Sequence, residues 1–245
     1  LKGNPGTDIN VTVSRKGKET EFKMKREKIA IPPVPYYGMV DSKTGYIRFS
    51  SFTQDCSQDV RNALTDLKTH NPHQIILDLR GNPGGVLTEA VEIVNLFVGP
   101  GNNVVSTKGR VKQFDEDFKT TKAAVDEKIP LAVLINRGSA SAAEIVAGAI
   151  QDIDRGVVVG QRSYGKGLVQ VTRPLSYNTQ LKVTTAKYYI PSGRCIQALD
   201  FSRPNEDPDR HDTPGHAGRC RFSDGFFRLE RGYEFHGHDR RYRHG

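Results

Sequence analysis

The sequence predicts an α/β fold in which strands and helices alternate and pack in layers. Short apolar runs of strand length recur along the chain, most clearly at residues 73–79 and 129–135. Each run ends in a turn rich in Gly, Asn or Pro, and a segment with helical spacing follows it, at 86–97 and up to Ile153. This order of elements is typical of a layered α/β core. The length of 245 residues fits one large domain with a smaller additional piece.

The N-terminal residues predict a β-hairpin outside this core. Residues 8–14 and 19–25 alternate apolar and polar side chains, and Arg15-Lys16-Gly17-Lys18 lies between them. Two strands alone are marginally stable in water, so we expect the hairpin to belong to a larger unit. A proline-rich segment, with Pro32, Pro33 and Pro35, follows as a linker.

The core elements are predicted from periodicity and turn residues. One helix is expected at 55–70, where Val60, Leu64 and Leu67 have helical spacing and Asp55 or Ser57 is the expected cap. The charged segment 110–128 is expected to be a loop with a short helix. The expected strands are 37–40, 45–50, 73–79, 103–107, 129–135, 156–160, 168–173 and 181–190.

The last part of the chain has a different composition. Residues 202–245 contain no lysine, nine of the arginines and five of the seven histidines, with few aliphatic side chains. Such a segment cannot bury enough apolar surface to offset its ordering entropy, so we expect a disordered or frame-shifted tail. The spacing of its histidines fits no common metal site. We therefore predict neither a metal nor another cofactor.

Charge and cysteine content exclude several classes of protein. The formal net charge of +8 is scattered, with no basic stripe interleaved with aromatic residues, so nucleic-acid binding is not expected. No run of 18 apolar residues predicts a membrane span. Three cysteines far apart do not make a disulfide framework. The chain begins at Leu1 in a Lys-Gly-Asn-Pro-Gly turn, without a signal segment, and we expect a fragment.

Two serines, Ser139 and Ser141, lie at the turn between the strand 129–135 and the following Ala-rich helix. Serines at such a position either cap the helix or serve as a nucleophile next to its N-terminal N–H groups. A nucleophile needs a base, and no histidine lies between His73 and His211. His70 and His73 themselves look like surface loop residues.

The loop Ser163-Tyr164-Gly165-Lys166-Gly167 offers a lysine as the base instead. A lysine accepts a proton only as the neutral amine, which burial beside apolar groups favours. Apolar strands border this loop on both sides, but an ordinary exposed loop lysine is the other interpretation. Gly84-Gly85, after the strand 73–79, either aims backbone N–H groups at a developing oxyanion or forms an ordinary tight turn.

Five sequence blocks together resemble the C-terminal processing proteases, also called tail-specific proteases. The blocks are Asp78-Leu79-Arg80-Gly81-Asn82-Pro83-Gly84-Gly85, Asn136-Arg137-Gly138-Ser139-Ala140-Ser141-Ala142-Ala143-Glu144-Ile145, Gln151-Asp152, Tyr164-Gly165-Lys166-Gly167-Leu168-Val169-Gln170 and Gly193-Arg194-Cys195-Ile196-Gln197. The resemblance implies a ClpP/crotonase-like peptidase core at 29–201. Residues 1–28 resemble the last strands of a PDZ domain, and 202–245 do not resemble the family.

The resemblance also implies roles for single residues. Ser141 rather than Ser139 matches the nucleophile, Lys166 the general base and Gln170 the residue that orients the lysine. The oxyanion hole falls on backbone N–H groups of Gly84 or Gly85 and of Ala142, and Asp152 matches an acidic position near the site in some members. Ala143 and Cys195 stand where the family often has serine.

The family further implies a protein or peptide substrate with a free C-terminus, an acyl-enzyme intermediate and a location outside the cytoplasm, in the periplasm or at the membrane. Two alternatives stay open. One is an inactive peptide-binding relative, since the PDZ part is incomplete and the tail departs from the family. The other is a crotonase-type acyl-CoA enzyme, which needs no serine–lysine pair. The oligomeric state and the substrate itself are not predicted.

Overall fold

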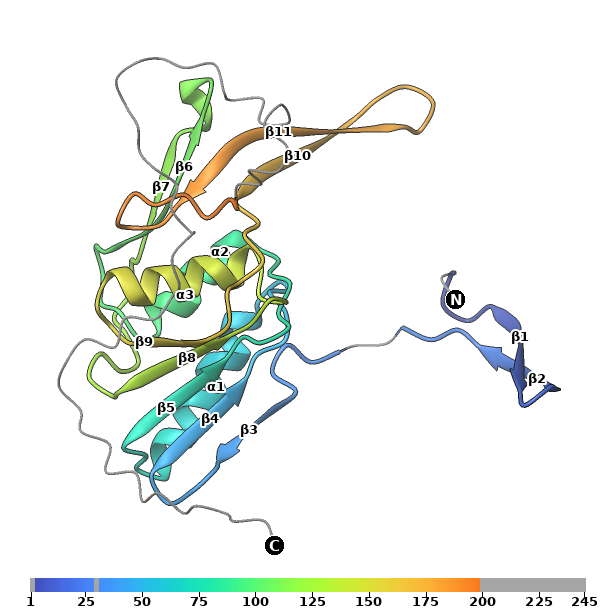
Figure 1. Ribbon diagram of the computed structural model, residues 1–245, viewed down its shortest axis with the longest axis horizontal. Helices are drawn as coiled ribbons and strands as arrows, with labels where there is room; N and C mark the ends of the chain where they lie inside the picture. Colours follow the sequence, from blue (N-terminus) through green and yellow to red (C-terminus); the bar gives the residue numbers. More distant parts are fainter. Residues whose placement is uncertain (1–2, 29–30, 199–245) are drawn as a thin grey trace, which may run out of the picture.

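The computed structural model describes residues 3–28 and 31–198, and its elements form three sheets and three α-helices (Figure 1). The N-terminal hairpin of β1 (Asp8–Arg15) and β2 (Lys18–Lys25) is a two-stranded antiparallel sheet that lies apart from the other elements. The hairpin itself was predicted from the sequence and is confirmed. Its turn has Lys16 and Gly17 at positive φ, and this conformation gives a two-residue loop a twist that matches the right-handed twist of the two strands.

The central sheet has five strands in the order β3-β4-β5-β8-β9. Its edge strand β3 is antiparallel to β4, and the other neighbours are parallel. The apolar runs read from the sequence form its middle, because parallel strands are buried by the helices that connect them. Its strands are β3 (Tyr36–Met39), β4 (Thr44–Arg48), β5 (Gln74–Asp78), β8 (Leu131–Ile135) and β9 (Val157–Gly160).

Three helices make the crossovers between the parallel strands. They are α1 (Cys56–Thr69), α2 (Leu87–Asn95) and α3 (Ala142–Asp152). Helices α2 and α3 pack on each other and lie between the central sheet and a second sheet (Figure 1). The resulting order is sheet, helices, sheet, so the layered α/β class predicted from the sequence is confirmed. No helix among the described residues is long and apolar enough to cross a membrane.

The second sheet is antiparallel, with the strand order β10-β11-β6-β7. Its strands are β6 (Asn103–Gly109), β7 (Glu116–Lys119), β10 (Leu168–Pro174) and β11 (Gln180–Tyr189). The short helix expected within 110–128 is the 3₁₀ turn η1 (Lys112–Phe114), but β7 was not predicted. It is a charged edge strand with little burial, so it lacks the apolar alternation that marks a half-buried strand.

The expected side-chain cap of α1 is wrong. Asp55 occupies the N-cap position at a φ of 61° and makes no side-chain cap bond. The carboxylate of Glu89, from α2, instead accepts the N–H groups of Asp55 at 3.0 Å and Ser57 at 2.8 Å. A side chain 32 to 34 residues away thus does the capping.

Candidate active site

Ser141 lies where β8 has ended and α3 begins, at the carboxyl edge of the central sheet. Its backbone has φ 56° and ψ −117°, an unusual conformation for a residue other than glycine. Ser141 and Glu144 are arranged as a capping box, yet the Ser141 hydroxyl makes no cap hydrogen bond. The Glu144 N–H is instead donated to the Ser141 backbone oxygen at 2.9 Å. The Ser141 side chain is partly exposed and its hydroxyl is available for chemistry.

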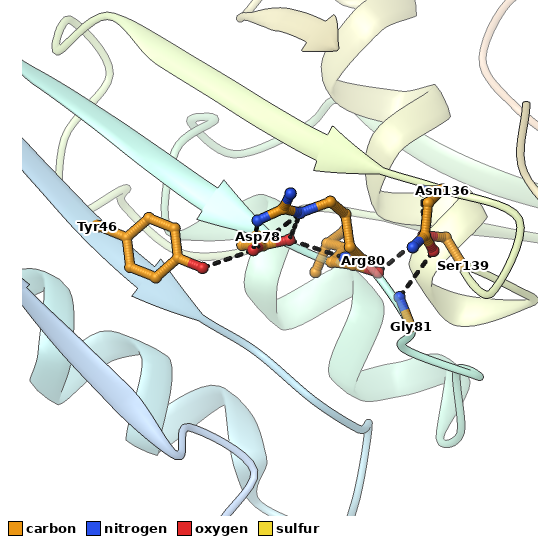
Figure 2. Close-up of polar contacts among 7 residues, drawn as sticks. Tyr46, Asp78, Arg80, Gly81, Asn136 and Ser139 are labelled. Atoms are coloured by element: carbon orange, nitrogen blue, oxygen red, sulfur yellow. Dashed lines mark hydrogen bonds and ion pairs between the residues drawn. The ribbon is translucent and has the colours of Figure 1, made fainter. Parts of the chain in front are cut away.

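Ser139 has a different role, although it is only two residues away. It is fully buried, and its hydroxyl donates to the backbone oxygen of Leu79 at 2.8 Å. The oxygen of the Ser139 hydroxyl also accepts the N–H of Asn136 at 3.0 Å. Ser139 therefore connects the turn after β8 to the end of the neighbouring strand β5, and its buried hydroxyl is used both as a donor and as an acceptor (Figure 2).

Asn136 strengthens the same junction. Its side-chain oxygen accepts the N–H of Gly81 at 2.8 Å (Figure 2) and that of Gly138 at 2.9 Å. The bond to Gly81 crosses from the turn after β8 to the turn after β5, and the bond to Gly138 closes the turn after β8 itself. Two side chains of the turn with the predicted nucleophile, Ser139 and Asn136, thus bind the backbone of the turn with the predicted oxyanion hole.

A buried charged group lies behind this junction. Asp78, at the end of β5, accepts three bonds from the Arg80 guanidinium, and the Tyr46 hydroxyl donates to it at 2.5 Å (Figure 2). Burial alone would raise the pKa of Asp78, but the Arg80 and Tyr46 hydrogen bonds outweigh it and lower the pKa. Burial, with the Asp78 charge, raises the pKa of Tyr46. This ion pair is satisfied within the fold and stabilises the end of the strand.

The glycine turn after β5 packs directly against Ser141. A side chain at Gly84 would place its Cβ 2.8 Å from both the Ser141 Cβ and the Ala142 nitrogen, and Gly84 has a φ of 86°. Only glycine fits this position without displacing the nucleophile's turn. The buried Asn82 holds the turn, because its side chain donates to the Phe49 oxygen at 3.0 Å and accepts the Gly84 N–H at 2.9 Å.

The three N–H groups predicted to form the oxyanion hole, those of Gly84, Gly85 and Ala142, differ in their hydrogen bonds. The Gly84 N–H is engaged by Asn82, whereas the N–H groups of Gly85 and Ala142 have no hydrogen-bond partner within residues 3–28 and 31–198. Ala142 is the first residue of α3, where N–H groups have no partner inside the helix. Of the two glycines, only Gly85 therefore has an N–H group without a hydrogen-bond acceptor in the described residues.

Glu144 brings the Lys166 loop to this site. Its buried carboxylate accepts the N–H groups of Ser141 at 2.8 Å, Lys166 at 2.8 Å and Gly165 at 2.6 Å. No role for Glu144 was predicted from the sequence. The signal that could have found it is the Ser141-x-x-Glu144 spacing of a capping box.

The Lys166 side chain is exposed, and in the described part of the chain its ammonium group makes no hydrogen bond or ion pair. Gln170 lies in β10 just after a β-bulge, also exposed, and no hydrogen bond joins it to Lys166 there. The structure thus brings the backbone of Lys166 to Ser141, while the orienting role of Gln170 stays a prediction. The desolvation expected for Lys166 is not present in this conformation.

Asp152 lies at the far end of α3. It is eleven residues after Ser141, which corresponds to about 16 Å along a helix. Its carboxylate accepts the Ser192 N–H at 2.9 Å and pairs with the Arg194 guanidinium. In this structure Asp152 fastens the turn after β11, and its supporting role in catalysis stays a prediction.

The other sequence candidates do not assemble a site. His70 and His73 are exposed, as predicted, and Cys56 and Cys195 are buried. No cluster of three or more His, Cys, Asp or Glu that could hold a metal ion occurs within 3–28 and 31–198. The expected metal-free tail at 202–245 lies outside the described residues.

The fold and this site define a serine-hydrolase type of core, with a helix N-terminus and a glycine turn around one accessible serine. The model of Peptidase family S41 matches residues 43–203, and the chain belongs to this family. It is 40% identical over 208 residues to the carboxy-terminal-processing protease of Bartonella bacilliformis, which covers 82% of this chain and 47% of that protein. It is also 36% identical over 199 residues to a probable CtpA-like serine protease of Staphylococcus aureus, covering 80% and 39%.

Solved structures agree with this assignment. The photosystem II D1 C-terminal processing protease superposes with a TM-score of 0.62 at 28% identity, over 79% of this chain and 54% of that one. Mature CPAF in complex with lactacystin shares the fold alone, with a TM-score of 0.53 at 14% identity, over 79% and 62%. The chain spans 47% and 39% of the length of the two curated relatives.

Proposed function

We propose that this chain is the peptidase core of a serine endopeptidase that cleaves proteins near their C-termini by a Ser141–Lys166 dyad. The observation that carries the proposal is the contrast between the two serines. Ser139 is buried, and its hydroxyl both donates and accepts a hydrogen bond within the fold, whereas Ser141 is accessible at the start of α3. Glu144 binds the backbone of both Ser141 and Lys166, so the proposed nucleophile and base belong to one site.

The proposed reaction has two stages. The Lys166 amine takes the proton of the Ser141 hydroxyl as its oxygen attacks the peptide carbonyl, and the N–H groups of Gly85 and Ala142 stabilise the oxyanion. The C–N bond then breaks, and the lysine returns the proton to the leaving amine. In the second stage water attacks the acyl-enzyme ester, again giving a proton to Lys166, and the new carboxylate is released while the proton returns to Ser141.

The neutral amine that this mechanism needs would require a less exposed Lys166 than the one described. A bound substrate covering the Lys166 loop would supply the missing desolvation, because closing a site expels water. Gln170, four residues further along the chain, is the proposed group that orients the amine once this loop is covered. Asp152 would act only indirectly, through α3.

The choice of substrate rests on the relatives. The names carboxy-terminal-processing protease and CtpA-like serine protease support cleavage near a C-terminus. Family membership favours a peptidase over the crotonase-type alternative. We further propose that residues 1–28 are the end of a PDZ domain, that 29–201 form the peptidase core, and that the protein works outside the cytoplasm. Cell fractionation tests the location.

Cleavage of a peptide by Lys166 variants tests the proposed function. Lys166→Ala should remove activity, and Lys166→Arg should also fail because a guanidinium stays protonated. Lys166→His could restore a small fraction, since imidazole is a base at neutral pH. Cleavage by Lys166→Ala at close to the unmodified rate would show that the base lies elsewhere. Binding of the peptide by the unmodified chain without turnover would favour the inactive relative.

A further inference from the structure

Glu144 makes more hydrogen bonds than its position in the helix requires. A capping box needs one bond from the N3 carboxylate to the N-cap N–H, here that of Ser141. The same carboxylate also accepts the N–H groups of Gly165 and Lys166, which are 21 and 22 residues further along the chain. One buried carboxylate therefore binds two separate segments of the site.

The distances fix how far apart these segments are. Glu144 Oε2 lies 2.8 Å from the nitrogen of Ser141 and 2.8 Å from that of Lys166, so the two nitrogens are at most twice this distance apart. Gly165 donates to the other oxygen, Oε1, at 2.6 Å. In the described residues no lysine or arginine pairs with Glu144, and its carboxylate is bound by the backbone N–H groups of Ser141, Gly165 and Lys166.

The loop that Glu144 holds is also hydrogen-bonded to other elements, through Gln161 to Ile135 and through Gly167 to Gln197 and Tyr188. Residues 161–167 have no regular secondary structure, and Gly165 and Gly167 flank the lysine. Tyr164 donates its N–H to the Ser139 oxygen at 2.9 Å, and the Gly165 oxygen accepts the Ala198 N–H at 2.9 Å. Within the described residues, only Glu144 has a side chain bonded to both Ser141 and Lys166.

We infer that Glu144 is a positioning residue for the proposed dyad: its carboxylate sets the separation between the Ser141 turn and the Lys166 loop. It acts through backbone N–H groups and transfers no proton. The inference rests on the proposed function, because it assigns the purpose of the clamp to the Ser141–Lys166 pair. A carboxylate is needed, since all three partners are donors. Glutamine in either orientation would turn its own NH₂ group toward at least one of them.

The test compares Glu144→Gln with Glu89→Gln in the full chain. Glu89 is a matched control, because it too is a buried glutamate that accepts two backbone N–H groups, of Asp55 and Ser57, away from Ser141. We expect Glu144→Gln to lower kcat about 100-fold, as for a small misplacement of a reacting group, with KM within about twofold. We expect the two variants to lower the melting temperature by similar amounts, and we expect Glu89→Gln to leave kcat unchanged.

A double-mutant cycle separates positioning from a general structural role. If Glu144 acts through Lys166, the double variant Glu144→Gln/Lys166→Ala should be no slower than Lys166→Ala alone. The rise of cleavage with pH should also disappear in Glu144→Gln. Fully additive losses, or a normal kcat and pH profile for Glu144→Gln, would overturn the inference. An active Lys166→Ala variant would instead contradict the proposed function itself, because that function needs Lys166 as the base.

Amide hydrogen exchange provides a readout that does not depend on turnover. Glu144→Gln should speed exchange of the Gly165 and Lys166 amides, while Glu89→Gln should affect only the amides at the start of α1. Unchanged exchange at Gly165 and Lys166 would contradict the clamp. If Glu144→Gln does not melt cooperatively, Glu144→Asp serves in its place, because it keeps the carboxylate but shortens its reach, and the same outcomes apply.

Discussion

Replacing Ser139 and Ser141 in turn by alanine should separate stability from catalysis. Ser139→Ala removes the bond to the Leu79 oxygen and the acceptor of the Asn136 N–H. The Leu79 oxygen keeps a second donor, the N–H of Asn82 at 3.1 Å, so the main cost is the N–H of Asn136 without an acceptor. A lost bond with an unsatisfied partner costs about 1–3 kcal/mol. For a domain of this size, about 2 kcal/mol corresponds to a fall in Tm of about 4–8 °C.

Ser141→Ala should behave in the opposite way. The Ser141 hydroxyl makes no cap hydrogen bond, so we expect the Tm to stay within about 2 °C of the unmodified value. Peptide cleavage should fall by about 10⁴-fold or more, the size of loss seen when a nucleophile is removed. Ser139→Ala should keep most of its cleavage rate at temperatures well below its Tm.

Thermal melts followed by circular dichroism, with peptide cleavage measured on the same samples, check both variants. A Ser139→Ala variant with the melting temperature of the unmodified chain would contradict the structural role of Ser139, because the bonds to Leu79 and Asn136 would then contribute nothing to stability. The assignment of the nucleophile is wrong if Ser139→Ala is inactive while Ser141→Ala still cleaves.

Two further predictions follow from the glycine turn and from one ion pair. Gly84→Ala should abolish cleavage and destabilise the fold by more than Gly81→Ala, because both residues have positive φ but an added Cβ meets backbone atoms only at Gly84. Gly81→Ala should cost only about 1–2 kcal/mol of unfolding free energy. Equal melting temperatures and equal activities of the two variants would contradict the close approach of Gly84 to the Ser141 turn. Burial alone would raise the pKa of Asp126, but its bonds with Lys68 and with the N–H groups of Ile129 and Lys128 lower it to about 2. The stability from Asp126 is therefore present above its ordinary pKa near 3.8 and lost as the pH falls through about 2, and Asp126→Asn should show a smaller loss of Tm over this range of acid melts.

The sequence was sufficient for elements whose pattern is local. The apolar runs of β5 and β8 and the Ala-rich α3 lie where periodicity and turn residues put them. The strand β7 was missed because edge position, rather than burial, makes it a strand, and its charged residues carry no apolar alternation. The cap of α1 by Glu89 was missed because a local pattern cannot reveal a partner from another helix.

The candidate site divides in the same manner. Sequence spacing identified a turn with two serines, but the difference between them comes from contacts with other strands, above all the bond from Ser139 to Leu79. The resemblance to a family, rather than the local chemistry, singled out Ser141 as the predicted nucleophile. Glu144 was recognisable as a capping residue from its spacing, whereas its bonds to Gly165 and Lys166 depend on how the chain returns after β9.

The rate at which a fluorophosphonate labels Ser141, measured across pH in the unmodified chain and in Lys166→Ala, tests the central claim most directly. The reagent needs only the nucleophile and its base, because the serine oxygen displaces fluoride from phosphorus. We predict that mass spectrometry finds the label on Ser141, that its rate rises with pH as the lysine loses its proton, and that Lys166→Ala slows labelling at least about 100-fold. A label on Ser139, or equal labelling rates with and without Lys166, would contradict the Ser141–Lys166 dyad.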